Sequence, residues 1–177
     1  MKKKVNPRRI PMAKKELDRD AITEEATTDQ LAHAWILVAN ALVEQGYATP
    51  DEVVKLSDEV NGYIAKNPMH GDKLKAALAR ADAMMGKTFA HPHLDPRAVR
   101  SAVELESFRK KVHQVAYHAA QCSICLGLES TGKFTKDQLQ RIFFDADLTE
   151  AAINAGHDSY QEIEARIEKQ IRADISA

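Results

Sequence analysis

Apolar residues recur every three or four positions along most of this chain, a spacing typical of amphipathic helices. One pattern occurs twice: residues 34–61 and 120–147 each carry an apolar stretch, a glycine, a threonine-centred start signal and a second apolar stretch. Two similar helical hairpins are therefore expected, through either an internal duplication or chance recurrence of a short helical pattern. At a constant offset of 86 residues, Ala34, Leu42, Gly46, Thr49 and Asp51 recur as Ala120, Leu128, Gly132, Thr135 and Asp137.

Local signals define the turn of each hairpin. Gly46 and Gly132 follow an apolar helix, where glycine ends a helix in the left-handed conformation without a steric clash. Three residues later, Thr49 and Thr135 open the pattern Thr-x-x-Glu/Gln, which predicts a capping box at the start of the second helix. Pro50 falls at the first helical position, where no backbone amide is required.

The remaining segments predict further helices, so we expect an all-α bundle of seven or eight helices. Another capping pattern, at Thr27, separates a charged helix over 13–26 from the first apolar helix, and Asp95 is expected to cap a helix that begins at Pro96. Shorter helices are expected over 72–85, near 149–154 and from 159 onwards. The segment 96–127 predicts one long central helix, a spine for the bundle and a contact through which a homo-oligomer forms. Its apolar seam comprises Leu105, Phe108, Val112, Val115, Ala119, Cys122 and Leu126.

Composition adds an expectation about the compartment. The 177 residues are 44% hydrophobic and 29% charged, as in ordinary soluble domains. No apolar run reaches the roughly 18–20 residues of a membrane span, and no apolar signal-peptide core follows the basic start. Cys122 and Cys125 lie three residues apart within a predicted helix, a spacing that suits a reducing compartment. A cytoplasmic protein without a membrane association is expected.

Charge divides the chain unevenly. Residues 1–15 carry seven basic side chains and no acidic one, whereas the other 162 residues hold 18 basic and 26 acidic side chains. We therefore distinguish a basic extended arm (1–12), a helical hairpin region (13–86) and a region with the long helix, the second hairpin and the last helix (87–177). The two helical regions are expected to share one core. The arm is either a nucleic-acid contact or a solubilising tail. Its candidate phosphate-binding residues, including two just beyond it, are Lys2, Lys3, Lys4, Arg8, Arg9, Lys14 and Lys15.

One group of residues has the chemistry of a metal site. His118, Cys122 and Cys125 follow the spacing i, i+4, i+7, which places them on one face of the long helix. An imidazole and two thiolates suit zinc, with His91, His93 or His157 as a fourth ligand. The competing interpretation is core packing, because free cysteines are among the most buried residues. We favour packing, and expect no cofactor.

A second group, His91-Pro92-His93 with Asp95, suggests a ligand pair or an acid–base site on a loop. A turn followed by a helix cap accounts for the same residues. The chain contains no Gly-rich phosphate loop, no HExxH pattern and no nucleophile motif. A non-enzymatic protein is therefore expected.

Three short motifs carry a resemblance to known proteins. Lys3-Lys4-Val5-Asn6-Pro7-Arg8-Arg9, His33-Ala34-Trp35 and Leu56-Ser57-Asp58-x-Val60 resemble small helical proteins of phages and prophages, over about the first 60 residues. Some proteins of that kind are anti-CRISPR inhibitors of Cas9. The resemblance implies a phage-encoded binding protein that inhibits a host defence nucleoprotein, such as Cas9 with its guide RNA. The alternatives are a nucleic-acid-binding regulatory protein that uses the basic arm and a helical metal-dependent enzyme.

Overall fold

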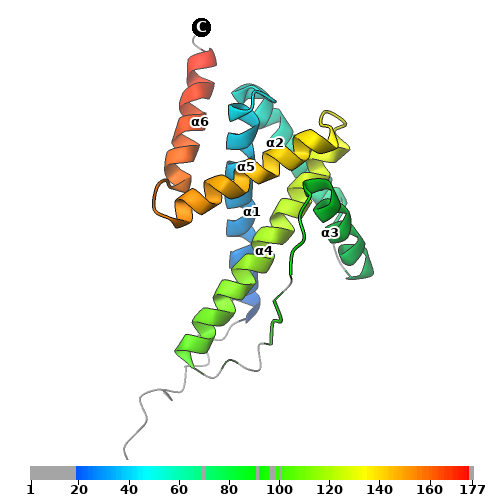
Figure 1. Ribbon diagram of the computed structural model, residues 1–177, viewed down its shortest axis with the longest axis vertical. Coiled ribbons are helices and arrows are strands. Elements are labelled where there is room, and N and C mark those ends of the chain that lie inside the picture. Colours follow the sequence, from blue (N-terminus) through cyan, green and yellow to red (C-terminus); the bar gives the residue numbers. More distant parts are fainter. Residues whose placement is uncertain (1–18, 69–70, 91, 96–98, 100, 176–177) are drawn as a thin grey trace, which may run out of the picture.

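The computed structural model describes residues 19–68, 71–90, 92–95, 99 and 101–175, and these residues form helices and their connections without a strand (Figure 1). The predicted all-α class is confirmed. The predicted number of seven or eight helices is too high for this part of the chain, which contains six. They are α1 (Arg19–Glu44), α2 (Pro50–Lys66), α3 (Gly71–Met85), α4 (Ala102–Ser130), α5 (Lys136–Asn154) and α6 (Tyr160–Ile175).

Both hairpin turns have the predicted local structure. Gly46 and Gly132 adopt positive φ angles of 66° and 68°, in the left-handed region that favours glycine. The Thr49 and Thr135 hydroxyls each accept a hydrogen bond from the backbone amide three residues on, and the third side chain reaches back to the threonine amide. Pro50 occupies the start of α2 as expected.

Two expected helices are continuous with their neighbours, which explains the lower count. The predicted start at Thr27 is wrong because α1 already begins at Arg19, and Ala26 is fully buried against α4 residues of a second apolar cluster. Tertiary packing on both sides of Thr27 thus favours a continuous helix. The predicted short helix near 149–154 is the end of α5, since Thr149 donates its hydroxyl to the Asp145 carbonyl one turn earlier.

The long central helix is present as α4, which has 29 residues and begins later than predicted. Ser101 is its N-cap, and its hydroxyl accepts from the Glu104 amide, so the predicted cap at Asp95 is wrong. Of the two possible caps, Asp95 and Ser101, the helix uses Ser101, which together with Glu104 resembles a capping box. Most of the predicted seam is buried within this single chain, at Leu105, Phe108, Val112, Cys122 and Leu126.

The packing of the helices is reciprocal between the two halves of the chain. Helix α1 packs on α4 and α5, and correspondingly α4 packs on α1 and α2. In the same way, α3 packs on α4 and α5, and α6 packs on α1 and α2. Exchanging α1, α2 and α3 for α4, α5 and α6 leaves the set of principal packed pairs unchanged. In Figure 1, α5 crosses the front of the molecule over α1 and α4.

The core draws on both predicted regions, 13–86 and 87–177. One cluster contains buried residues of all six helices, from Ala34 on α1 to Ile163 on α6. A smaller cluster joins the beginning of α1 to the beginning of α4, through Ala26, Leu105, Phe108, Val112 and Ala116. None of the helices in the described ranges is both long and apolar enough to cross a membrane.

Candidate functional site

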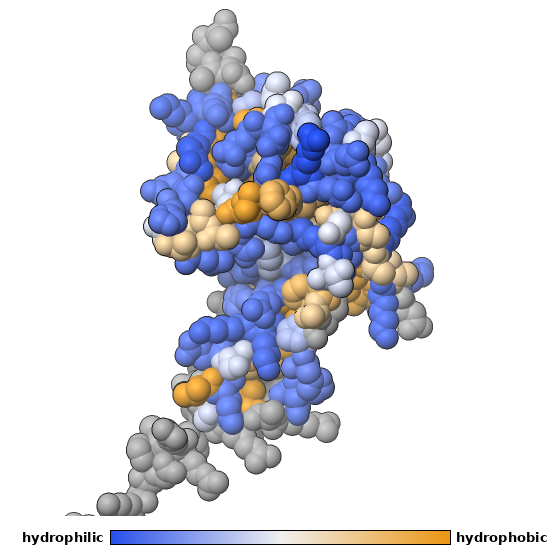
Figure 2. Space-filling model, viewed as in Figure 1, coloured by the Kyte–Doolittle hydropathy of each residue, from blue (hydrophilic) through white to orange (hydrophobic). Residues whose placement is uncertain are grey.

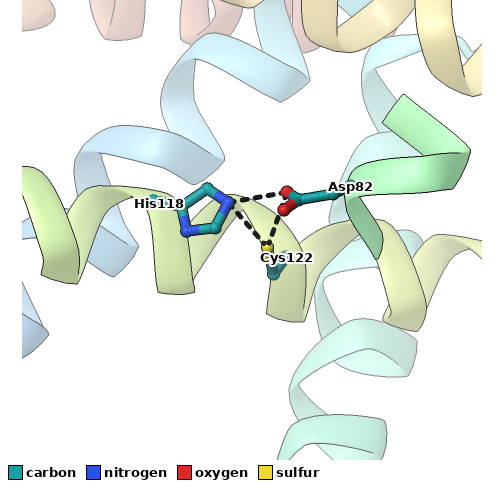
Figure 3. A group of neighbouring side chains, drawn as sticks. All are labelled: Asp82, His118 and Cys122. Atoms are coloured by element: carbon teal, nitrogen blue, oxygen red, sulfur yellow. Dashed lines mark hydrogen bonds and ion pairs between the residues drawn. The ribbon is translucent and has the colours of Figure 1, made fainter. Parts of the chain in front are cut away.

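Three potential metal ligands converge where α3 meets α4, and we call Asp82, His118 and Cys122 the donor cluster (Figure 3). His118 and Cys122 lie one helical turn apart on α4, so both side chains reach the same face. Asp82 approaches from α3. The His118 Nε2 atom lies 2.7 Å from Asp82 Oδ1 and 3.4 Å from Cys122 Sγ, and this sulfur lies 3.9 Å from the same carboxylate oxygen.

The cluster is enclosed on the α4 side. Cys122 is fully buried and His118 is 4% exposed, whereas Asp82 is partly exposed. The Phe89 ring stacks on the His118 imidazole, with centroids 4.1 Å apart and planes 12° apart, which fixes the orientation of the imidazole. Burial, followed by the nearby charge of Asp82, raises the pKa of the Cys122 thiol well above its usual range. The thiol is therefore protonated at neutral pH without a cation, and it is a poor nucleophile.

The arrangement also differs from a nucleophile–histidine–carboxylate relay. In such a relay the nucleophile and the carboxylate contact different imidazole nitrogens, so that a proton can pass across the ring. Here Asp82 and Cys122 both contact Nε2 of His118. Three donors that face one point suit a shared cation: a carboxylate oxygen, an imidazole nitrogen and a sulfur are all known zinc ligands.

The structure brings together two of the three predicted metal candidates. His118 and Cys122 belong to the cluster, whereas Cys125 is buried in the main core outside it, where burial raises its pKa to about 12. The predicted fourth ligands His93 and His157 are exposed and outside the cluster, and His91 lies outside the described residues. Asp82 was missed, because no spacing motif connects it to a histidine 36 residues later.

A groove of about 1,020 Å³ lies next to the cluster, and His118 forms part of its wall. Lys87 forms an ion pair of 2.6 Å with Asp147, and the Gln121 amide donates to Asp147 at 2.8 Å and to the Tyr117 hydroxyl at 3.2 Å. This network ties the segment after α3 to α4 and α5. Sequence patterns gave no signal for it, because its members come from three separate segments.

The surroundings shift the pKa values of two residues that line the groove, Tyr117 and Glu150. Burial raises the pKa of Tyr117, and the charges of Glu150 and Asp147 add to the effect. Burial also raises the pKa of Glu150, although a hydrogen bond with Tyr117 opposes the shift. The groove thus carries the acidic residues Asp147 and Glu150 together with Lys87 and Lys110, and burial partly desolvates Tyr117 and Glu150.

An exposed apolar surface lies on α5, and we call Phe144 and Leu148 the α5 patch. Phe144 is 61% exposed and Leu148 is 55% exposed, one helical turn apart. Figure 2 shows apolar residues across the face formed by α5. Beside Phe144, a depression of about 560 Å³ extends to the ends of α1 and α3. The patch was not predicted, because apolar residues at helical spacing look like core positions.

The candidate nucleic-acid-binding residues Lys2, Lys3, Lys4, Arg8, Arg9, Lys14 and Lys15 lie outside the described residues. No protein family, no curated protein and no solved structure matches this chain.

Proposed function

We propose that the chain is a non-enzymatic binding protein of phage origin, which inhibits a host defence nucleoprotein such as Cas9 with its guide RNA in the host cytoplasm. The observation that carries the proposal is the α5 patch, where Phe144 and Leu148 are more than half exposed. Exposed aromatic and aliphatic side chains that lie together often mark a surface that a partner covers. Aromatic residues of this kind dominate the energetics of many protein interfaces.

The charge around the α5 patch suits a basic partner. Asp137 and Asp145 lie along the depression beside Phe144, where Arg141 is the basic neighbour. The adjacent groove is mixed, since Lys87 and Lys110 line it together with Asp147 and Glu150. The chain beyond residue 15 has a net charge of −8. A Cas9-type effector holds its nucleic acids in a positively charged channel, which an acidic helical body can occupy in their place.

The basic arm supplies the second contact in this proposal. Residues 1–15 carry a charge of +7, while the body repels nucleic acid. If arm residues neutralise about five phosphates of the guide or target, the logarithm of the binding constant should fall linearly with the logarithm of the salt concentration. The slope should be near −0.9 per phosphate for a duplex. Two prolines in the arm restrict its conformations and lower the entropy lost on binding.

The experiment combines co-purification with Cas9–guide RNA and a DNA-cleavage assay. The wild-type protein is expected to be retained and to reduce cleavage at micromolar concentration. The variant Phe144→Glu/Leu148→Glu should bind at least thirtyfold more weakly, equivalent to about 2 kcal/mol. Val54→Glu is the control, since Val54 is 50% exposed on α2 and lies outside the patch. Wild-type protein that is neither retained nor inhibitory would rule out this target.

The basic arm favours a second candidate, a regulatory protein that binds nucleic acid directly. This function predicts salt-sensitive DNA binding by the isolated protein, which deletion of residues 1–12 abolishes. The α5 variant would then bind DNA as well as the wild type. The inhibitor instead predicts a larger loss from the α5 variant than from the arm deletion when the Cas9 complex is the partner.

A further inference from the structure

We propose that Asp82, His118 and Cys122 bind a thiophilic divalent cation, with Zn²⁺ as the fitting ion, and that this cation fastens α3 to α4. The three donor atoms lie within 4.8 Å of one another, and they come from two helices that pack directly. One face of α4 supplies two ligands and α3 supplies the third, so the cation would join segments that are 36 residues apart.

The distances fit a cation after a small movement. Zinc–ligand bonds of about 2.0–2.3 Å at tetrahedral angles separate neighbouring ligand atoms by roughly 3.4–3.6 Å. The sulfur of Cys122 already lies 3.4 Å from Nε2 of His118 and 3.9 Å from Oδ1 of Asp82. The contact between Asp82 and His118, at 2.7 Å, must open by about 0.7 Å, and the 3.9 Å separation of Cys122 and Asp82 must close by about 0.3 Å on the same bond lengths. Asp82 is the partly exposed member, so it has room to move.

The donor types select the class of ion. A thiolate and an imidazole are soft or borderline ligands, which favour zinc and its neighbours in the transition series. Calcium and magnesium prefer all-oxygen coordination. Because the donor cluster provides three protein ligands, a water molecule would complete a tetrahedral zinc site from the exposed side of Asp82.

The surroundings support the imidazole as a ligand. Phe89 stacks on His118, so the ring is held with Nε2 toward both Asp82 and Cys122 before any ion arrives. Pre-orientation of a ligand lowers the conformational cost of binding. Phe89 belongs to the segment that follows α3, and the cation would therefore also stabilise the path of this segment across α4.

The test is a titration of the full-length, reduced protein with Zn²⁺ against a chromophoric chelator, and with Co²⁺ as a spectroscopic substitute. We expect one equivalent of zinc to bind. The cobalt form should show sulfur-to-cobalt charge-transfer absorption together with the intense visible bands of a tetrahedral ion. Wild-type protein that leaves the chelator saturated and gives no sulfur-to-cobalt band would overturn the proposal.

The chain offers a matched pair of cysteine variants. Cys122→Ala should lose the charge-transfer band and at least 100-fold of the zinc affinity, whereas Cys125→Ala, which removes the buried thiol outside the cluster, should retain both. Equal behaviour of the two variants would contradict the assignment. Asp82→Asn changes a partly exposed residue, so the fold should tolerate it better than a change at the buried Cys122. This variant should weaken zinc binding at least tenfold, and an unchanged affinity would remove Asp82 from the site.

Discussion

The two halves of the molecule, α1–α3 and α4–α6, pack in the same way but differ in their chemistry. Positions 86 residues apart are buried in both halves. They include Ala34 and Ala120, Val38 and Ile124, Leu42 and Leu128, Val53 and Leu139, and Leu56 and Ile142. The repeated pattern therefore specifies equivalent core positions, and the reciprocal contacts between the halves support an internal duplication.

The chemistry differs where the third helix of each half meets the long helix of the other. At the α3–α4 contact, Asp82 faces His118 and Cys122. At the α6–α1 contact, Tyr160 stacks on His33 with ring centroids 4.0 Å apart. The positions on α1 equivalent to His118 and Cys122 hold Ala32 and Ile36. One packing scheme thus accommodates a donor cluster on one side and an aromatic contact on the other.

The largest expected effect comes from the equivalent core leucines. Leu42→Ala and Leu128→Ala should each lower the free energy of unfolding by about 2–5 kcal/mol, because each leaves a cavity at a fully buried site. The two losses should both fall in this range, since both leucines are fully buried at equivalent positions. Denaturant unfolding measures both. A small loss at only one of them would break the equivalence of the halves.

The next effect concerns a difference between the α2–α4 contact and the equivalent α1–α5 contact. A Cβ atom on Gly127 would lie 2.9 Å from a Val60 methyl carbon and 3.3 Å from its backbone Cα. The equivalent positions carry Ala41 and Ala146, both buried. Gly127→Ala should therefore cost about 1–3 kcal/mol by overpacking. Adding Val60→Ala reproduces the alanine pair at the equivalent α1–α5 contact, and the double variant should lose less than the sum of the two single variants. Additive losses would show that the two sites do not interact.

A smaller effect is expected at the hairpin caps. Thr49→Ala and Thr135→Ala each remove the hydroxyl that accepts from the third helical amide, at a cost of about 1 kcal/mol. Thermal unfolding should show similar shifts for the two variants. Thr49→Ser is the control, since serine keeps the hydroxyl that accepts from the Glu52 amide. A loss for Thr49→Ser as large as that for Thr49→Ala would contradict the role of the hydroxyl as a cap.

The smallest effect is a dependence on pH. The folded protein raises the pKa of Glu150 above its ordinary value of 4.5, so the folded state binds this proton more tightly than the unfolded state. The stability from this group is fully present below pH 4.5 and is lost as the pH rises through the folded pKa. Glu150→Gln should therefore reduce the loss of stability between pH 4.5 and 7. Unfolding curves at a series of pH values measure this, and an unaltered pH profile would contradict it.

Local signals predicted the parts of the fold that depend on neighbouring residues. Gly46 and Gly132 require only their own backbone conformation, and Thr49 and Thr135 need only the next turn, so both hairpins were predictable. The signal at Thr27 failed because contacts of Ala26 with α4, distant in the sequence, stabilise a continuous helix.

The candidate site was only partly predictable for the same physical reason. His118 and Cys122 share a helix face, which their spacing reveals, whereas Asp82 joins them only through the packing of α3 on α4. The exposure of the α5 patch could not be predicted from the sequence either. Phe144 follows the fully buried Phe143, and only the packing of α5 determines which of the two is exposed.

The contrast between the α3–α4 and α6–α1 contacts is tested most directly by amide hydrogen exchange of the reduced protein with and without Zn²⁺. We expect zinc to slow exchange in α3 and in the turns of α4 around His118 and Cys122. Exchange in α6 and around His33 on α1 should stay unchanged. Equal protection of both contacts, or no protection of α3 at saturating zinc, would contradict the account.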